Sequence, residues 1–512
     1  MLVKTYGSAI VGVNAIPVTV EVNVSQGVGF FMVGLPDNAV KESGQRISSA
    51  FGQSGFKVPN QHVVVNLAPA DIKKEGTAYD LTIAVGILGA VGLVMPDELN
   101  RYVIMGELGL DGTLRPIKGV LPIAIEARSR GCKGIIIPSE NAREAAIVNN
   151  LEVYGADSLK QVVDFFNGMG EISQTIVDTR AEFANSLSQY EYDFADVKGQ
   201  ETVKRCLEIA AAGGHNAIMI GPPGSGKSML AKRMPSILPP LTLAESLETT
   251  QIHSVAGLMR KEDSLIAVRP FRAPHHTVSD VALIGGGAVP KPGEISLAHN
   301  GVLFLDELPE FKRSVLEVLR QPMEERRVCI SRAKMTIEYP ASFMLIAAMN
   351  PCPCGYYNHP TMDCTCPPGT VKRYLNKVSG PLMDRIDLHI EVTPVPVSLL
   401  NKEGCAESSA MIRDRVIAAR TIQTKRFRAS SSVHCNAQMT SRMTREYCVL
   451  NNECRTIMEQ AMNRLGLSAR AYDRILRVSR TIADLEAESD IHPYHLQEAI
   501  TYRSLDRDSW GI

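Results

Sequence analysis

The segment Gly221–Ser228, with the sequence GPPGSGKS, constrains the fold of this chain more than any other feature. It follows a short apolar run, Ala217–Ile220, and a helix is expected to begin near Met229. A glycine loop between a buried strand and a helix turns its backbone N–H groups toward phosphate oxygens, and the helix N-terminus adds a favourable dipole. The sequence therefore predicts a nucleotide-binding domain built on a parallel sheet.

Two side chains of this loop have specific predicted roles. Lys227 is expected to reach the β- and γ-phosphates, and the hydroxyl of Ser228 is expected to ligate Mg²⁺. ATP and Mg²⁺ are therefore the expected cofactors. The predicted nucleotide-binding residues are Gly221, Pro222, Pro223, Gly224, Ser225, Gly226, Lys227, Ser228 and Met229.

Two further apolar runs end in polar residues suited to hydrolysis. Val302–Leu305 is followed by Asp306, expected to hold Mg²⁺ through water, and by Glu307, expected to polarise the attacking water. Phe343–Met349 is followed by Asn350, whose amide is expected to orient that water. Alone, two acids after a strand are often a simple cap and a terminal Asn is often a turn residue. Behind a phosphate loop, they predict a hydrolytic site.

Composition limits the class of protein. A chain of 512 residues is expected to form two to four domains. The formal net charge is -1, so nucleic-acid binding would have to come from local patches. The N-terminus lacks a signal-peptide layout, and the longest apolar stretch, Leu81–Met95, falls short of the roughly 20 residues that span a bilayer. We expect a cytoplasmic protein with no membrane partner.

The pattern along the chain predicts an α/β multidomain protein. Strands and helices mix over residues 1–169, which favours an α/β or α+β domain, and residues 170–192 are polar and patternless, as in a linker. Strands and helices alternate over 193–397, as in a parallel sheet. Amphipathic helices are expected over 398–512. In the first domain the predicted strands are Val18–Val24, Val63–Leu67 and Gly134–Pro138, and the predicted helices are Leu81–Met95 and Leu121–Arg130.

Several long strings identify a family. Asp193–Gln200, the phosphate loop, Asp306-Glu307 and Asn350 together resemble an AAA+ ATPase module. The chain further resembles the magnesium-chelatase-like family called YifB or ComM, and the resemblance covers essentially its whole length. It implies an AAA+ core over 193–397 and a helical lid of the magnesium-chelatase C-terminal type over 398–512. The matching strings are Arg269–His276, Pro292–Gly301, Asn350–Gly355 and Ser379–Asp387.

The resemblance also implies an assembly. Members of such families form rings, here a homo-hexamer, with each ATP held between neighbours. Arg385 then looks like the arginine finger that stabilises charge on the neighbour's γ-phosphate. An ion pair of Arg385 with Asp384 or Asp387 is the alternative. Arg470 resembles the lid arginine called sensor 2, and Arg474 and Arg477 follow it on the same helical face.

Two insertions are typical of this clade. One, a helix-2 insert within about residues 264–295, contains Gly285–Gly287. The other is a pre-sensor-1 hairpin at about residues 328–340, whose Arg332 and Lys334 would project into the channel of a ring and contact DNA, branched or single-stranded. On an isolated hairpin these two cations would instead be ordinary surface charges.

A cysteine cluster lies over residues 352–366. It consists of two Cys-x-Cys pairs, Cys352 with Cys354 and Cys364 with Cys366, among prolines and glycines. Four thiolates suit a tetrahedral structural Zn²⁺. His359, between the pairs, could replace one thiol, and a loop of reduced thiols is the alternative.

The N-terminal strings Lys74–Leu81 and Gly106–Ile117 resemble the proteolytic domain of Lon, an α+β domain of the S5-like kind, and its equivalent in the RadA recombination protein. Lon-type cleavage needs a serine nucleophile and a lysine that takes its proton. The serine position falls on Ala78 and the lysine position on Leu121, neither of which can act. A displaced pair, Thr77 with Lys118, is the remaining route to proteolysis.

Three functions follow. The family implies a DNA motor that drives branch migration or helicase activity in recombination, including the integration of transformed DNA in competence. A chelatase-like ATPase that remodels a protein or a metal cofactor is the alternative, although the chain lacks the Asp-x-Ser-x-Ser string of the chelatase partner. An ATP-dependent protease is disfavoured by Ala78 and Leu121.

Overall fold

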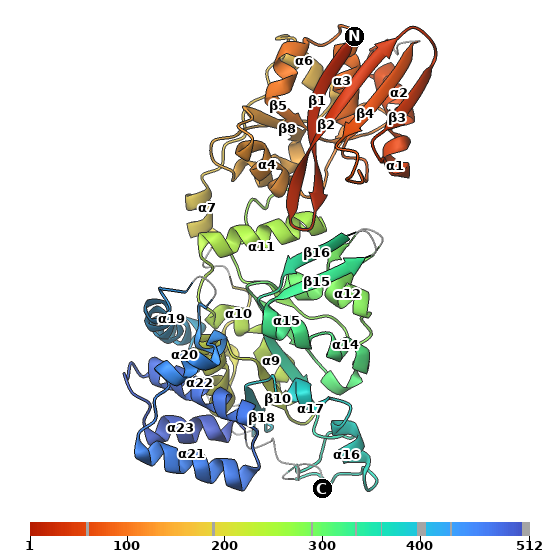
Figure 1. Cartoon of the computed structure of the whole chain (residues 1–512). Coiled ribbons are helices and arrows are strands. Elements are labelled where there is room, and N and C mark those ends of the chain that lie inside the picture. Colours follow the sequence, from red (N-terminus) through yellow and green to blue (C-terminus); the bar gives the residue numbers. More distant parts are fainter. Residues whose placement is uncertain are drawn as a thin grey trace.

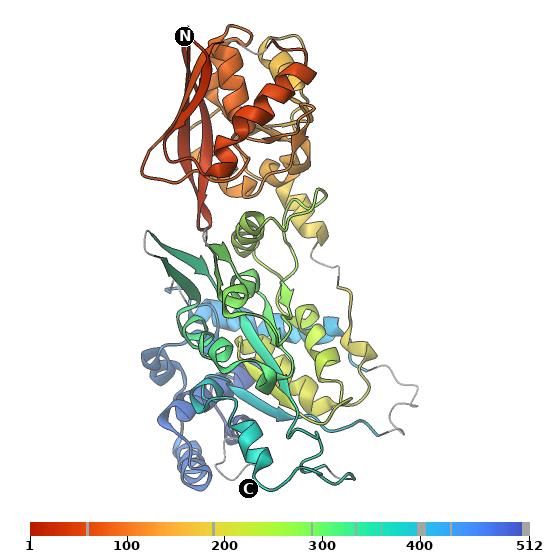
Figure 2. The ribbon, with the colours of Figure 1, turned by 90° about the vertical axis from the view of Figure 1, so that its right-hand side faces the viewer.

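The computed structural model describes residues 1–57, 61–186, 190–287, 290–332, 335–359, 361–396, 406–430 and 433–503. Two parts follow one another along the long axis of the molecule: an N-terminal sheet with its helices and a central sheet with its helices. A group of C-terminal helices lies beside the central part (Figures 1 and 2). The chain is thus a mixed α/β protein with more than one core.

The N-terminal part contains a seven-stranded mixed sheet in the order β3-β4-β2-β1-β5-β8-β9. The alternating valines Val18, Val20, Val22 and Val24 are buried on one face of β2, as their period of two predicts. The pairs β1–β2 and β2–β4 are antiparallel, whereas β3–β4, β1–β5, β5–β8 and β8–β9 are parallel. The strands are β1 Leu2–Val11, β2 Asn14–Ser25, β3 Gly29–Val33, β4 His62–Ala68, β5 Tyr102–Ile104, β8 Gly134–Pro138 and β9 Glu152–Ala156, with the small pair β6 Glu107–Leu108 and β7 Leu114–Arg115.

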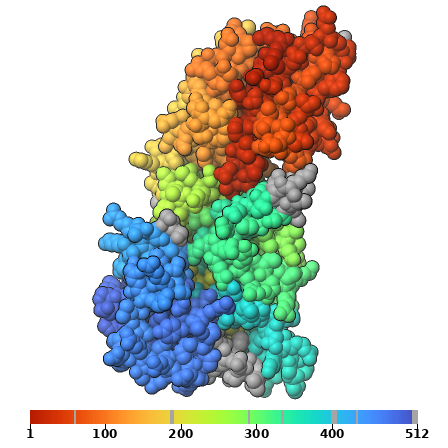
Figure 3. All heavy atoms as spheres, viewed as in Figure 1, coloured from red at the N-terminus to blue at the C-terminus, as the bar shows by residue number. Residues whose placement is uncertain are grey.

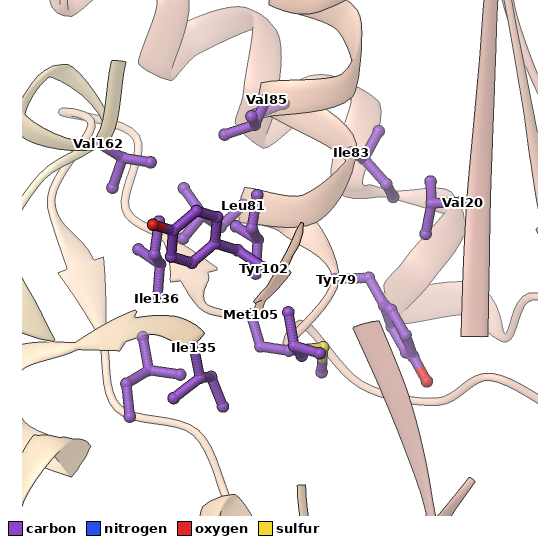
Figure 4. Close-up of a cluster of buried hydrophobic side chains, with 14 of the residues drawn as sticks. Val20, Tyr79, Leu81, Ile83, Val85, Tyr102, Met105, Ile135, Ile136 and Val162 are labelled. Carbon is purple, nitrogen blue, oxygen red and sulfur yellow. The ribbon is translucent and has the colours of Figure 1, made fainter. Parts of the chain in front are cut away.

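Helix α3, Asp80–Ala90, is the centre of the N-terminal core, and every one of its residues is buried. Its Leu81, Ile83 and Val85 project among side chains of the sheet (Figure 4). A Cβ on Gly86 would lie 2.7 Å from Val22 Cγ2, so glycine allows the helix to lie directly on the sheet. The remaining helices here are α1 Asn38–Lys41, α2 Ser43–Gln53, α4 Val120–Ser129, α5 Ala142–Ala146 and α6 Leu159–Phe166.

The central part is built on a five-stranded parallel sheet in the order β11-β14-β17-β10-β18. Its inner strands are apolar throughout and buried on both faces, which is typical of parallel sheets covered by helices. The chain leaves β10 toward the far edge, returns through β14 and β17, and then adds β18 on the other side of β10. The strands are β10 Ala217–Ile220, β11 Phe271–Arg272, β14 Val302–Leu305, β17 Met344–Met349 and β18 Leu388–Glu391.

Helices and two small antiparallel ribbons surround this sheet. The ribbon β15–β16 runs over Arg327–Arg332 and Met335–Pro340, where the sequence predicts a hairpin. Arg332 ends β15, whereas Lys334 lies outside the described residues. The other ribbon is β12 Gly285–Gly286 with β13 Lys291–Pro292, and the helices are α8 Glu201–Gly213, α9 Lys227–Lys232, α10 Met234–Ile237, α11 Leu243–Ala256, α12 Asp280–Ile284, α13 Glu294–Leu297, α14 Arg313–Glu317, α15 Arg320–Glu325, α16 Thr370–Leu375 and α17 Gly380–Met383.

Beyond residue 405 the described chain is helical and packs beside the central sheet (Figure 3). The helices are α19 Ser409–Arg426, α20 Ser441–Tyr447, α21 Asn452–Leu465, α22 Ala469–Leu485 and α23 Pro493–Thr501. Within the described residues, no helix has the length and apolar character needed to cross a bilayer.

The predicted linker is not without structure. Helix α7, Thr179–Ser186, forms within it, and Glu182 on this helix pairs with Arg143 of the N-terminal part at 2.5 Å. Glu182 also accepts a hydrogen bond from Ser264 of the central part. The short polar segment has no apolar periodicity, so tertiary contacts rather than an amphipathic pattern stabilise its helix.

The N-terminal and central parts meet where α4 approaches α11 (Figure 1). Gly119 N donates to Ser254 O at 3.0 Å, and Leu121 N donates to Ser254 Oγ at 3.4 Å. A Cβ on Gly257, at the end of α11, would lie 2.6 Å from Lys118 Cε. The beginning of α4 is therefore packed against the end of α11.

Candidate nucleotide site

The phosphate loop follows β10 and leads into α9, as the sequence predicts. Lys227 is 8% exposed, and its Nζ donates to Gly221 O at 2.7 Å, to Pro222 O at 2.8 Å and to Asn350 Oδ1 at 3.2 Å. Burial lowers the pKa of Lys227, while the carboxylate of Asp306 acts in the opposite direction. A buried ammonium held only by neutral oxygens is suited to binding an anion, because phosphate oxygens offer stronger partners than carbonyls.

Ser228 and Asp306 meet at the carboxyl ends of β10 and β14. Ser228 Oγ donates to Asp306 Oδ2 at 2.5 Å, and the backbone N–H of Glu307 donates to Asp306 Oδ1 at 2.9 Å. Mg²⁺ prefers hydroxyl, carboxylate and water oxygens, so this pair fits the ion predicted from the sequence. Ligands of parallel sheets bind at such strand ends, next to the point where the connections reverse direction.

Glu307 faces a residue to which the sequence analysis assigned no role. Its Oε2 lies 3.1 Å from Nδ1 of His276, while its own backbone is left-handed, with φ 54°. The ring centroid of His276 lies 4.0 Å from that of His275. The two consecutive histidines that end the string Arg269–His276 were the available signal, but their separation from Glu307 in the chain hides their proximity to it.

Asn350 follows β17, beside β10 in the sheet. Gly221 N donates to Met349 O at 3.2 Å, so the end of β17 is bonded to the start of the phosphate loop. The structure therefore brings Lys227, Ser228, Asp306 and Asn350 together at one edge of the sheet, with Glu307 next to Asp306 in the chain.

Arg385 and Arg470 lie elsewhere. Both line a cavity of about 510 Å³ between the central sheet and the C-terminal helices, which contains no phosphate-loop residue in its described lining. Arg470 is exposed in the first turn of α22, whose cap is Ser468. The described residues show no hydrogen bond or ion pair from either arginine to the phosphate loop. The described lining includes seven arginines (Arg269, Arg326, Arg385, Arg420, Arg470, Arg474 and Arg477) and four acidic residues (Glu245, Glu324, Asp387 and Asp473).

Arg385 has a different partner from the two that its sequence suggests. Its Nη2 lies 2.7 Å from Glu324 Oε1, and its Nη1 donates to Pro381 O at 2.7 Å. Asp387 is instead paired with Arg474 at 2.5 Å, and accepts from Asn216 N at 3.1 Å. The ion-pair partner of Arg385 among the described residues is therefore Glu324 of α15, and neither Asp384 nor Asp387.

The four cysteines converge into one cluster just after β17. Their sulfurs all lie within 4.8 Å of one another, with 3.2 Å from Cys352 to Cys354, 3.8 Å from Cys352 to Cys364, and 3.6 Å from Cys354 to Cys364. Zn–S bonds of about 2.3 Å in a tetrahedron place sulfurs about 3.8 Å apart, whereas a disulfide would place them about 2.05 Å apart. Cys366 completes the set, so the donors fit a structural Zn²⁺.

His359 lies outside this set. Its Nδ1 accepts hydrogen bonds from the backbone of Thr361 at 3.2 Å and of Met362 at 3.1 Å. Burial opposes ionisation of the Cys354 thiol, but hydrogen bonds from the Tyr356 backbone, Cys352 and the Thr365 backbone lower its pKa to about 6. Backbone N–H groups directed at a sulfur favour the thiolate, the form that binds metal.

The N-terminal part does not assemble the displaced protease pair. Thr77 Oγ1 donates to Glu107, whereas Lys118 packs against Gly257 of the central part. At the positions of the Lon serine and lysine, Ala78 is half-buried and Leu121 is fully buried. The described residues contain no hydrogen bond between Thr77 and Lys118.

A parallel sheet with a phosphate loop, an acidic pair and an asparagine at its strand ends defines a P-loop nucleotide-binding domain of the AAA+ class. Three family models, all of magnesium chelatase subunit ChlI, match separate parts of the chain. The model for magnesium chelatase, subunit ChlI, matches residues 193–400, that for subunit ChlI of Mg-chelatase matches 20–141, and that for the ChlI C-terminal region matches 406–503.

Individual relatives agree with these models. The chain is 46% identical to the competence protein ComM of Haemophilus influenzae, over 99% of this chain and 98% of that protein. It is 45% identical to the uncharacterized protein YifB of Escherichia coli, over 98% and 96%. A shorter match, 28% identical over 126 residues, joins 24% of this chain to 22% of Lon protease 2 of Bacillus subtilis. The chain belongs to the YifB/ComM family of magnesium-chelatase-like AAA+ proteins.

Proposed function

We propose that this chain is an ATP-hydrolysing ring motor that moves DNA, with branch migration or helicase activity in recombination or in the integration of transformed DNA. The ring assembly is supported by one observation. The candidate phosphate and Mg²⁺ residues lie at one edge of the sheet, whereas Arg385 and Arg470 line a separate cavity. Two arginines that serve ATP but lie away from the chain's own phosphate loop can act on a neighbour's nucleotide. A closed ring, such as a hexamer, gives every subunit such a neighbour.

In the proposed reaction, each residue of the candidate site has its own role in ATP hydrolysis. Lys227 binds the β- and γ-phosphates, Asn350 orients the attacking water, and Glu307 draws its proton toward the carboxylate. Ser228 and Asp306 hold Mg²⁺, which when bound neutralises charge on the phosphate oxygens. Arg385, from the neighbour, stabilises the charge that develops on the transferred phosphoryl group, and Arg470 binds the same phosphates.

Two features support the proposal that the motor acts on DNA. A relative at 46% identity carries the name competence protein, and strand β15 ends at Arg332, two positions before Lys334 in the sequence. In a ring, cations on such a hairpin from every subunit would face the phosphates of one strand. The N-terminal part is then a Lon-like scaffold without the catalytic pair, and residues 398–512 are the helical lid.

A chelatase-like remodelling ATPase is the second candidate, favoured by the match to magnesium chelatase models. The two are separated by incubating the full chain with a synthetic four-way junction and ATP, beside Lys227→Ala and Glu307→Gln. Conversion to duplex products, lost in both variants, is the expected result. Normal basal ATP hydrolysis with neither stimulation by DNA nor junction conversion would refute the DNA motor and favour remodelling.

Lys334→Glu tests the hairpin. Arg464→Glu is the matched control, because Arg464 is exposed on α21, which Figure 1 places far from the hairpin. We expect Lys334→Glu to weaken DNA binding and flatten its salt dependence while basal hydrolysis stays unchanged, and Arg464→Glu to change neither. Equal DNA affinity in the two variants would remove the hairpin from the proposal.

A further inference from the structure

The cysteine cluster is attached to the nucleotide site at two points. Cys352 is fully buried two positions after Asn350, whose side chain accepts the hydrogen bond from Lys227. At the other point, a Cβ built on Gly355 would lie 2.4 Å from Pro223 Cδ, so the Gly355 backbone rests on the phosphate loop itself. The turn Cys352–Gly355, closed by the bond from Gly355 N to Cys352 O at 3.0 Å, joins the two contacts.

The segment from 352 to 366 has few other means of keeping this shape. It contains no helix or strand in its described residues, 352–359 and 361–366. Three of its four cysteines are partly exposed, and among its side chains only that of Cys352 belongs to the described hydrophobic core. Closing a loop of this length costs conformational entropy, and a metal that joins both ends of the loop offsets that cost.

A small cavity lies between this segment and the phosphate loop. Gly221 and Pro222 line it from the loop, Gly355 and His359 from the cysteine segment, and Thr393 from the end of β18. Its volume of about 20 Å³ leaves little room for the two segments to shift. A change in the conformation of the cysteine segment would therefore reach the phosphate loop directly, by way of Gly355 and Pro223.

We propose that Zn²⁺ held by Cys352, Cys354, Cys364 and Cys366 keeps Gly355 seated against Pro223 and Asn350 beside Lys227, so that zinc occupancy sets the affinity of the loop for ATP. This inference rests on the proposed function, because it takes the loop as the ATP site. The metal has a structural role: four thiolates complete its coordination and leave no position for a reactant. Loss of zinc loosens the segment and lets the phosphate loop move away from its binding geometry.

The first measurement is zinc content by elemental analysis, together with affinity for a fluorescent ADP analogue, in the full-length protein purified without chelator. We expect one zinc per chain in the wild type. Cys364→Ser should lose the metal and weaken ADP binding at least about tenfold, the usual effect of losing support around a site. Cys132→Ser, a cysteine of the N-terminal part, is the control and should change neither quantity.

Two glycine substitutions test the contact between Gly355 and Pro223 separately from the fold of the cysteine segment. Gly355→Ala should keep its zinc but lose ADP affinity, since the added Cβ displaces Pro223. Gly369→Ala is its control, because Gly369 also has a positive φ, +77°, but a Cβ there meets nothing within 4 Å. Gly369→Ala should therefore retain both zinc and ADP binding.

Four results would overturn the inference, and the last of them would also refute the proposed function. If the wild type contains no zinc and still binds ADP tightly, the metal is not needed for ADP binding. If Cys364→Ser loses its zinc but keeps its ADP affinity, zinc binding and ADP binding are not coupled. Wild-type ADP affinity in Gly355→Ala would lead to the same conclusion. A zinc-loaded wild type that binds no ADP would instead refute the proposed function itself, and with it this inference.

Discussion

Arg385 Nη2 lies 2.7 Å from Glu324 Oε1, and the side chain of Arg385 is 10% exposed whereas that of Glu324 is 57% exposed. The guanidinium is therefore fixed by one exposed carboxylate and one backbone carbonyl, at the wall of an arginine-lined cavity. A guanidinium held in this way is oriented before another subunit binds. A γ-phosphate, which carries more charge than the Glu324 carboxylate, can then compete with that carboxylate for Arg385.

If Arg385 acts on a neighbour, subunits with different lesions should complement each other. Arg385→Ala alone should lower ATP hydrolysis about 1000-fold or more, with nucleotide binding retained, as expected of an arginine finger. A mixture with Lys227→Ala should regain activity, since an intact phosphate loop then meets an intact arginine. Steady-state hydrolysis across mixing ratios measures this, and no gain at any ratio would place Arg385 outside the neighbour's site.

In the proposed site, Asp306 holds Mg²⁺ together with Ser228, so loss of the Asp306 carboxylate should change how hydrolysis depends on Mg²⁺ concentration. We expect Asp306→Asn to lower hydrolysis at limiting Mg²⁺ by about 10- to 100-fold and to shift the Mg²⁺ titration to higher concentration. The measurement is ATP hydrolysis as a function of Mg²⁺. Asp363→Asn, an exposed acid of the cysteine segment, is the control. If the Mg²⁺ titration curve of Asp306→Asn coincides with that of Asp363→Asn, Asp306 has no role in holding Mg²⁺.

Local sequence was enough to predict the strands that carry the site. The runs at 217–220, 302–305 and 343–349 are short, wholly apolar and followed by turn or charged residues, and each forms a strand of the central sheet within one residue of its predicted bounds. The spacing of the four cysteines predicted their cluster for a similar reason, because residues so near in the chain have few ways to lie apart.

Contacts between distant elements were not predictable in the same way. The shared cavity of Arg385 and Arg470 depends on how α22 packs against the sheet, and the pair of Arg385 with Glu324 depends on α15. The contact of Gly355 with Pro223 joins two loops with no pattern in common. Periodicity describes which face of an element is buried, but it does not say which other element covers that face.

The pair of Asp387 and Arg474 joins the central sheet to α22 and should contribute to stability. Asp387 is buried, and Arg474 lies 2.5 Å away with 17% of its side chain exposed. Removing one partner of a buried pair leaves an uncompensated charge, which costs about 3 to 5 kcal/mol. We expect Arg474→Met to lower the Tm of the central part by roughly 6 to 20 °C. An unchanged Tm would show that the pair contributes nothing to folding.

The same pair gives stability a pH dependence with a definite sign. Burial alone would raise the pKa of Asp387, but Arg474 and then His215 hold that pKa well below its usual range. A carboxyl group whose folded pKa is lowered stabilises the fold above its unfolded pKa, about 3.9, and that contribution is lost as the pH falls below it. In thermal melts, the difference in Tm between the wild type and Asp387→Asn should therefore stay constant from pH 6 to about pH 4 and narrow from there to pH 3.

The contact between His276 and Glu307 should restrain hydrolysis in the absence of DNA. Nδ1 of His276 lies 3.1 Å from Glu307 Oε2, so one oxygen of the proposed base is engaged by the ring instead of by the attacking water. The imidazole comes from the loop that follows β11, whereas Ser228 lies in the first turn of α9 and Asp306 directly follows β14. In the proposed mechanism, the Glu307 carboxylate must turn from the His276 ring toward the attacking water before it can act as the base.

Removing the imidazole should free that carboxylate. A hydrogen bond to a charged group contributes about 1.5 kcal/mol or more, so His276→Ala should raise basal ATP hydrolysis about tenfold and reduce further stimulation by DNA. His275→Ala is the control, because His275 bonds to Thr277 at 2.9 Å and not to Glu307. Hydrolysis with and without a four-way junction measures both. Lower basal activity in His276→Ala would mean instead that the histidine holds Glu307 in its working position.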